Sequence, residues 1–144
     1  MPSFHRVHGS CAARDGWGVL LSGPSGSGKS DLLLRLLDRG FQLVADDQVD
    51  IAEGQASAPE ALAGLLEVRG LGILRLPYVP STTLRLAVLV GRAGARLPQP
   101  ETHMETGLPM VRIDPSSPSA PQQVALALDC AIGRVAQVAG AFAP

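Results

Sequence analysis

Residues 23–47, GPSGSGKSDLLLRLLDRGFQLVADD, decide the fold of this 144-residue chain. The run that leads into them, GWGVLLSG at 16–23, is apolar and bounded by glycines, which predicts a buried strand. A stripe of leucines predicts a helix at 29–39, and Gly40 is placed to end it in the left-handed conformation. FQLVADD at 41–47 predicts a second strand. A strand, a glycine-rich turn, a helix and a strand in this order are typical of α/β proteins.

The remaining patterns add further strands. QVDIAEG at 48–54 alternates like a half-buried strand, TLRLAVLV at 83–90 alternates more clearly, and MVRIDP at 110–115 gives one more. Segment 58–74 predicts one or two helical turns followed by two short strands. Its neighbour at 91–109 is broken by prolines and glycines and predicts an ordered loop.

A helix closes the predicted fold. Ser119 and Gln122 form the Ser-x-x-Gln pattern of a capping box, which marks the start of a helix. Five apolar residues beyond it step by four and three and predict one stripe on the core: Val124, Leu128, Ala131, Val135 and Val138. The expected fold class is α/β, a mixed β-sheet with flanking helices, in a single domain over residues 1–144.

The composition limits the functional classes. Hydrophobic residues make up 46% of the chain, enough for one continuous core. With 12 basic and 13 acidic residues the net charge is -1, so no positive field marks a nucleic-acid binder. Cys11 and Cys130 lack metal-type spacing and suit a reducing compartment. Because no apolar run reaches the length of a signal peptide core or a membrane span, we expect a cytoplasmic protein with no membrane partner.

Residues 23–30 satisfy the P-loop pattern G-x-x-x-x-G-K-[ST]. Glycines let backbone N–H groups turn toward a polyphosphate, and the helix that follows adds its positive dipole end. Lys29 can then reach the β and γ phosphates, and the Ser30 hydroxyl can bind Mg²⁺. A glycine-rich turn with a surface lysine is the alternative, but the flanking strand and helix favour a nucleotide site. The predicted nucleotide-binding residues are Gly23, Pro24, Ser25, Gly26, Ser27, Gly28, Lys29, Ser30 and Asp31.

Two adjacent aspartates end the strand that follows this helix. Asp46 and Asp47 would point to opposite sides if the strand continued, so we expect them to have different tasks. One would organise the metal, and the other would approach the nucleophile as a general base. Ordinary turn chemistry is the alternative reading, and it would be preferred if the P-loop pattern were absent.

Two weaker candidates lie elsewhere. Glu67 and Arg69 face the same way if they lie on a strand, so they could serve a magnesium–phosphate centre or simply pair with each other. His8 is a histidine near the terminus, and its spacing from His5 does not indicate a metal site.

Together these motifs resemble the catalytic domain of HPr kinase/phosphorylase, a P-loop-containing bacterial kinase that acts on a serine of the phosphocarrier protein HPr. The resemblance rests on the P-loop, the RG-x-x-LVADD block at 39–47 and the E-x-RG-x-G-I motif at 67–73. It runs from about His8 to the C-terminal helix and is strongest between Gly16 and Leu74.

The resemblance implies ATP and Mg²⁺ as cofactors, with Lys29 on the phosphates and Ser30 on the metal. It makes Asp47 the proton acceptor for phosphorylation and the proton donor for the reverse reaction. Asp46 is left as the metal-organising aspartate, Glu67 matches a second magnesium position, and Arg69 lies in the same motif.

Two further residues gain a role only through the resemblance. His8 matches the active-site histidine of the family, and Arg96, in ARLP, matches a catalytic arginine. The partner implied is HPr or its nitrogen-type paralogue, in a homo-oligomer that is hexameric in the family. The short chain resembles the truncated enzymes of alphaproteobacteria. DPSSPSAPQQ at 114–123 replaces a family segment tied to dephosphorylation, which weakens the expectation of phosphorylase activity.

Two other functional classes stay open. A small-molecule kinase or generic P-loop phosphotransferase would usually carry an arginine-rich lid, and the sequence has none. A nucleotide-sensing module without catalysis could lose its general base, so the presence of Asp46, Asp47 and Glu67 argues against it.

Overall fold

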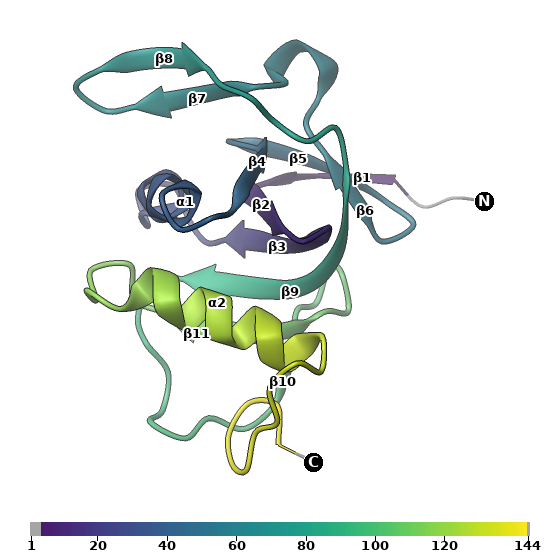
Figure 1. Cartoon of the computed structure of the whole chain (residues 1–144), viewed down its shortest axis with the longest axis vertical. Helices are drawn as coiled ribbons and strands as arrows, with labels where there is room; N and C mark the ends of the chain where they lie inside the picture. Colours follow the sequence, from purple (N-terminus) through teal and green to yellow (C-terminus); the bar gives the residue numbers. More distant parts are fainter. Residues whose placement is uncertain (1–3, 144) are drawn as a thin grey trace.

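The computed structural model describes residues 4–143, in which nine strands pair in one mixed β-sheet and two α-helices pack against it (Figure 1). A short hairpin forms a second sheet. In chain order the elements are β1 (Phe4–His8), β2 (Ser10–Arg14), β3 (Trp17–Ser22), α1 (Lys29–Leu37), β4 (Gln42–Ala45), β5 (Gln48–Ala52), β6 (Gln55–Ser57), the 3₁₀ turn η1 (Glu60–Leu62), β7 (Leu65–Val68), β8 (Gly72–Arg75), β9 (Thr82–Val90), β10 (Glu101–Thr102), β11 (Pro109–Ile113) and α2 (Ala120–Ala131).

The order of strands in the large sheet is β1-β5-β6-β9-β3-β2-β4, and β11 also pairs with β9. The pairs β3–β9 and β9–β11 are parallel, and the other pairs are antiparallel. This topology confirms a mixed sheet with flanking helices. It also brings the carboxyl ends of β3, β9 and β11 to one edge, which is where ligands bind in open α/β sheets.

The central strands bury apolar side chains on both faces. Along β3, Val19 and Leu21 join the cluster that contains the leucines of α1 and the apolar face of α2, whereas Leu20 joins a second cluster on the opposite face. On β9 the predicted alternation is present, with Leu86 and Val88 in the first cluster. Two cores therefore hold β3 from both sides, which fixes the place where the glycine-rich turn begins.

Helix α1 begins and ends close to where the sequence predicts. Its buried leucines, Leu32, Leu33 and Leu36, pack on the sheet. Beyond its last turn Gly40 has a φ of 88°, and the N–H of Phe41 donates to the Leu36 carbonyl at 3.2 Å. This is the left-handed helix end that the sequence predicts for Gly40.

The prediction for the C-terminal helix is partly wrong. Helix α2 ends at Ala131, and Val135 and Val138 are exposed beyond it, so the predicted stripe stops short. The capping box is also absent: the Ser119 hydroxyl caps no backbone N–H and instead accepts a hydrogen bond from Gln123 Nε2 at 2.9 Å. Pro118 and Pro121 flank the helix start, and backbone geometry sets it without that side-chain cap.

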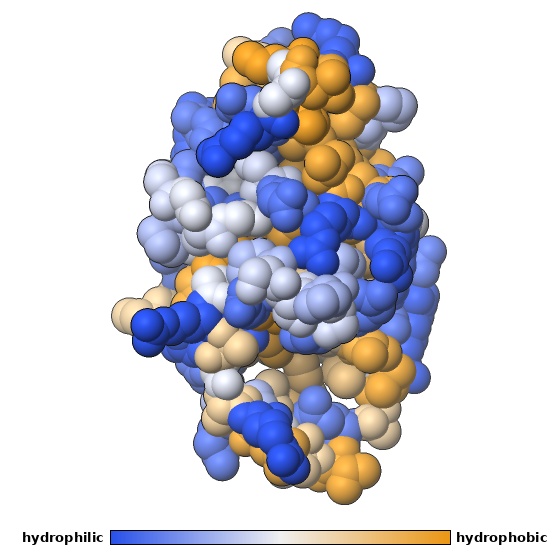
Figure 2. All heavy atoms as spheres, turned by 90° about the vertical axis from the view of Figure 1, so that its left-hand side faces the viewer, coloured by the Kyte–Doolittle hydropathy of each residue, from blue (hydrophilic) through white to orange (hydrophobic). Residues whose placement is uncertain are grey.

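The segment before β9 forms the predicted helical turn, η1, and the hairpin β7–β8. Leu66 of β7 is buried against the leucines of α1, so α1 lies between this hairpin and α2 (Figure 1). Leu71 and Ile73 of the hairpin are 70% and 71% exposed. Figure 2 shows apolar surface gathered over the part of the molecule where the hairpin lies. Between residues 4 and 143 no helix is long and apolar enough to cross a membrane.

Replacing Leu33 by alanine should lower the free energy of unfolding by about 2–5 kcal/mol, because a fully buried leucine leaves a cavity under α1. Leu34 is its neighbour on the exposed face, and Leu34→Ala should cost only about 0.5 kcal/mol. Urea denaturation of both variants measures the difference. Equal losses would contradict the packing described for α1.

Candidate active site

The turn between β3 and α1, residues Gly23–Gly28, is named here the glycine loop. Three of its glycines have positive φ values, 140° at Gly23, 79° at Gly26 and 103° at Gly28. Two of them are also closely packed: a Cβ on Gly23 would lie 2.7 Å from the Val90 carbonyl oxygen, and one on Gly28 would lie 2.9 Å from Pro115 Cγ. A larger residue at Gly23 or Gly28 would therefore clash, whereas at Gly26 only the positive φ favours glycine. Such a backbone turn before a helix is suited to binding an anion.

Lys29 begins α1, and its side chain folds back over the glycine loop. The ammonium group donates to the carbonyl oxygens of Gly23 at 2.8 Å and Pro24 at 2.9 Å. Burial lowers the pKa of Lys29 below its ordinary value, and the negative charges of Asp46 and Asp47 offset part of that shift. The cation thus lies at the rim of the loop, where an anion would offer it a stronger, charged partner than two carbonyls.

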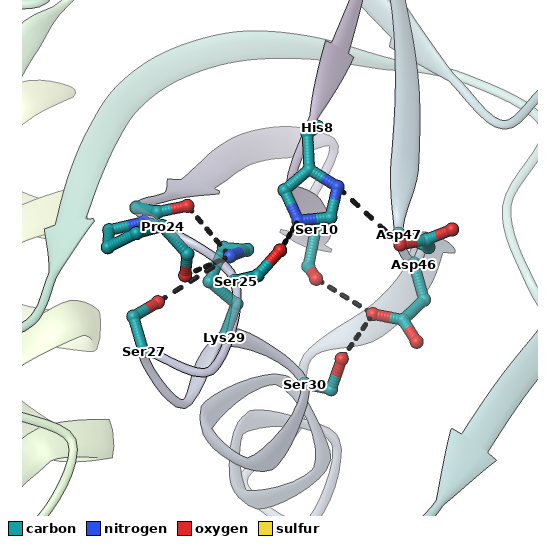
Figure 3. A network of polar contacts seen from close by, with 10 residues as sticks. His8, Ser10, Pro24, Ser25, Ser27, Lys29, Ser30, Asp46 and Asp47 are labelled. Carbon is teal, nitrogen blue, oxygen red and sulfur yellow. Dashed lines mark hydrogen bonds and ion pairs between the residues drawn. The ribbon is translucent and has the colours of Figure 1, made fainter.

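Asp46 follows β4 and is buried, with 7% of its surface exposed. Its Oδ1 atom accepts hydrogen bonds from two hydroxyls, Ser10 Oγ at 2.8 Å and Ser30 Oγ at 2.9 Å (Figure 3). Ser30 lies in the first turn of α1, next to Lys29. A carboxylate and a hydroxyl at a helix N-terminus are hard oxygen ligands, so these two side chains fit a Mg²⁺ ion bound beside a phosphate.

Asp47 has a different environment, although it is the next residue. β4 ends at Ala45, and the Gln48 N–H donates to the Asp46 carbonyl at 2.9 Å while Asp47 has a φ of 71°. This is a γ-turn with a left-handed central residue, which is rare and strained. The Asp47 side chain is 66% exposed. The turn, and not a continued strand, separates the two carboxylates.

His8 connects the glycine loop to Asp47. Its Nδ1 lies 3.5 Å from Asp47 Oδ1, and its Nε2 lies 3.5 Å from the hydroxyl of Ser25 (Figure 3). The next residue, Gly9, donates its N–H to the Asp47 carbonyl at 3.1 Å. A Cβ on Gly9 would lie 2.6 Å from the Leu21 carbonyl oxygen. A larger residue would therefore displace the backbone at position 9 and its hydrogen bond to Asp47.

Three predicted site residues are not brought to this network. Glu67 is exposed on β7, Arg69 lies in the hairpin turn, and Arg96 lies in the exposed loop after β9. In the described part of the chain none of them forms an ion pair with Lys29 or with the two aspartates, and Glu67 and Arg69 form none with each other. Asp31 is exposed on the first turn of α1. Residues 4–143 hold no group of three or more acidic, His or Cys side chains arranged for a metal.

Sequence reasoning missed other residues of this region. Ser10 is buried at the start of β2, and no spacing pattern points to it. A cavity of about 410 Å³ lies beside the glycine loop, and its lining includes His8, Gly23, His103 and Glu105. The last two come from the turn after β10, which the sequence predicts only as a loop.

Comparison with known proteins identifies the family. A family model described as HPr Serine kinase C-terminal domain matches residues 1–79, more than half of the chain. The chain belongs to this family. The match contains Gly9, the three glycines of the glycine loop, the Asp46–Asp47 pair and the β7–β8 hairpin.

Relatives of the HPr kinase family share much of the sequence. The HPr kinase/phosphorylase of Clostridium tetani is 49% identical over 76 residues, which is 50% of this chain and 25% of that protein. The HPr kinase/phosphorylase of Bordetella pertussis is 40% identical over 125 residues, or 74% of this chain and 41% of the relative. The chain therefore spans a quarter to two fifths of the length of these relatives.

The fold agrees with the family assignment. The solved structure of the HPr(Ser) kinase/phosphatase from Coxiella burnetii superimposes with a TM-score of 0.71, covering 90% of this chain and 98% of that chain at 23% sequence identity. The mixed sheet with two helices is therefore the fold that this chain shares with the Coxiella burnetii protein.

Replacing Asp47 by glycine should raise the free energy of unfolding by about 1 kcal/mol, because glycine adopts the left-handed conformation without strain. Gln48, the neighbouring residue in β5, provides the control: Gln48→Gly should lower the same quantity by about 0.5–1 kcal/mol. Thermal and urea denaturation measure both changes. If Asp47→Gly destabilises the protein as much as Gln48→Gly does, the γ-turn is not strained.

Proposed function

We propose that this HPr kinase family member transfers the γ-phosphoryl group of MgATP to a serine hydroxyl of an HPr-type phosphocarrier protein, and that residues 1–144 act as its catalytic domain. The observation that carries the proposal is the contact between His8, Ser25 and Asp47, because it sets an exposed carboxylate across the opening of the glycine loop. Family membership supports a kinase that acts on serine.

The phosphates of ATP would lie on the backbone N–H groups of the glycine loop. Lys29 would leave the carbonyls of Gly23 and Pro24 and pair with the β and γ phosphates as a point charge. Ser30 and Asp46 would hold Mg²⁺, which when bound neutralises charge on the phosphoryl group. Little covalent chemistry is left for the protein, so positioning and charge neutralisation do most of the work.

Asp47 would accept the proton of the attacking serine hydroxyl. Its exposure leaves the carboxylate open to an incoming side chain, and His8 Nδ1 lies close enough to orient it. The cavity lined in part by Gly23 and His8 would give the acceptor segment a place to enter. We also propose the roles that the resemblance implies for Glu67, Arg69 and Arg96. These roles would require the β7–β8 hairpin and the loop at 91–100 to approach the bound nucleotide.

We assign only the kinase direction. Residues 114–123 differ from the family segment that the resemblance ties to dephosphorylation, and here Pro115 packs on Gly28. Arg35 holds the same segment through its guanidinium, which donates to the carbonyls of Pro115 and Ser117.

The proposal is tested with the purified chain, HPr and radiolabelled ATP. Asp47→Asn should lower the rate of serine phosphorylation by about 10²–10⁴-fold, the usual contribution of a general base, while leaving MgATP affinity unchanged. Lys29→Ala should abolish transfer and weaken nucleotide binding. Asp38→Asn, at the opposite end of α1, is the matched control and should keep full activity. The proposal is wrong if the wild-type chain labels serine no faster than Asp47→Asn.

We also propose self-association, hexameric by the family resemblance. The exposed Leu71 and Ile73 of the β7–β8 hairpin support it, since neighbouring exposed apolar side chains are typical of interfaces. Ile73→Asp should therefore reduce the mass measured by light scattering toward that of the 14.9 kDa monomer. Leu126 is 56% exposed on α2, and Leu126→Asp serves as the control that keeps the assembly. A wild-type chain that is monomeric at all concentrations would contradict this proposal.

A further inference from the structure

Ser10 is the least exposed polar residue of the described chain, with 1% of its surface accessible. Within residues 4–143 four polar or charged residues are buried, and three of them, Ser10, Lys29 and Asp46, belong to the candidate site. Burying a hydroxyl costs free energy unless it forms a hydrogen bond, and the Ser10 hydroxyl donates to Asp46 Oδ1. The buried Ser10 hydroxyl at the start of β2 therefore has a specific hydrogen-bond acceptor, the Asp46 carboxylate.

We propose that Ser10 is a positioning residue for the metal–nucleotide complex: its hydroxyl fixes the Asp46 carboxylate so that the second oxygen faces the metal position. This inference rests on the proposed function, because it takes Asp46 and Ser30 as the residues that hold Mg²⁺. It assigns Ser10 no contact with substrate or metal.

The two carboxylate oxygens of Asp46 have different surroundings. Oδ1 takes both hydroxyl donors, and Oδ2 has no hydrogen-bond partner among the described residues. In that part of the chain no fully buried side-chain oxygen lacks a partner. Oδ2 is therefore not completely buried, and it is the carboxylate oxygen left to bind a metal ion or a water on that ion.

Ser10 and Ser30 do not hold Asp46 in the same way. Ser30 is exposed at the start of α1, so a bound ion can draw its oxygen away from Asp46. Ser10 is buried at the start of β2, so its hydroxyl cannot move toward the ion and stays on Asp46. The terminal torsion of an aspartate rotates easily. Ser10 is thus the contact that keeps the carboxylate oriented both before and after the nucleotide binds.

The neighbours of Ser10 serve the same turn. His8 contacts the Asp47 carboxylate, Gly9 donates to the Asp47 carbonyl, and Ser10 donates to the Asp46 carboxylate. Three consecutive residues, from the end of β1 to the start of β2, therefore each make one contact with the aspartate pair. A loss at Ser10 would free only the metal-facing member of that pair.

The test measures ADP affinity by titration calorimetry with and without Mg²⁺, so it needs no catalytic turnover. The gain in affinity that Mg²⁺ gives should fall about 10-fold or more in Ser10→Ala, the usual effect of removing a residue that orients a metal ligand. ADP affinity without metal should stay within about twofold of wild type, because the glycine loop is intact. Ser10→Thr keeps a hydroxyl and should restore most of the gain.

Thr82 provides the matched control, because its hydroxyl is also buried but donates to the Gly16 carbonyl at 3.1 Å, away from the aspartates. Thr82→Val should leave the Mg²⁺ gain unchanged. If Ser10→Ala does not fold, Ser10→Cys, whose thiol is a weak donor, takes its place with the same expected loss.

Three results would overturn the inference. A normal Mg²⁺ gain in Ser10→Ala rejects Ser10 as a positioning residue and leaves the proposed function intact. An equal loss in Thr82→Val assigns the effect to general instability. A wild-type chain whose ADP affinity does not respond to Mg²⁺ rejects both this inference and the proposed metal site.

Discussion

A buried carboxylate constrains the whole of this site. Asp46 lies at the end of β4 with little contact with solvent, and a charge in that position is tolerated only when hydrogen bonds compensate for lost hydration. The two compensating hydroxyls come from different elements, Ser10 from β2 and Ser30 from α1. Because β2 pairs with β4 and α1 packs on the sheet, the large core holds all three residues in register. The packing of these elements in the folded chain therefore brings Ser10, Ser30 and Asp46 together.

The same anchor explains how two adjacent aspartates acquire different chemistry. With the Asp46 side chain held inward, the γ-turn directs the Asp47 side chain toward solvent and His8. One carboxylate is thus buried and held by two hydroxyls, and the other is exposed. The Lys29 side chain folds back over the glycine loop and donates to two of its carbonyls. In the reaction that we propose, the buried carboxylate would hold Mg²⁺ and the exposed one would accept the proton of the serine hydroxyl.

Local patterns made much of the structure predictable. The glycines and the leucine stripe located β3, the glycine loop and α1, because each of these features depends on a few neighbouring residues. Contacts between distant segments were not predictable from them: no pattern revealed Ser10, and the extent of α2 depends on packing that the stripe of Val135 and Val138 does not encode. An active-site role for His8 was predicted only from the family resemblance, because the neighbouring sequence contains no motif that indicates one. The roles of all the predicted site residues stay predictions. Glu67, Arg69 and Arg96 also lie on a hairpin and a loop that form no ion pair with the network around Asp46 in residues 4–143.

A crystal structure of the chain with MgADP tests the central claim most directly. The account predicts a β-phosphate on the N–H groups of the glycine loop and a Mg²⁺ ion about 2.0–2.1 Å from Ser30 Oγ. The Asp46 carboxylate should face that ion while keeping its bond to Ser10. Nucleotide bound elsewhere, or both aspartates turned away from the phosphates, would contradict it.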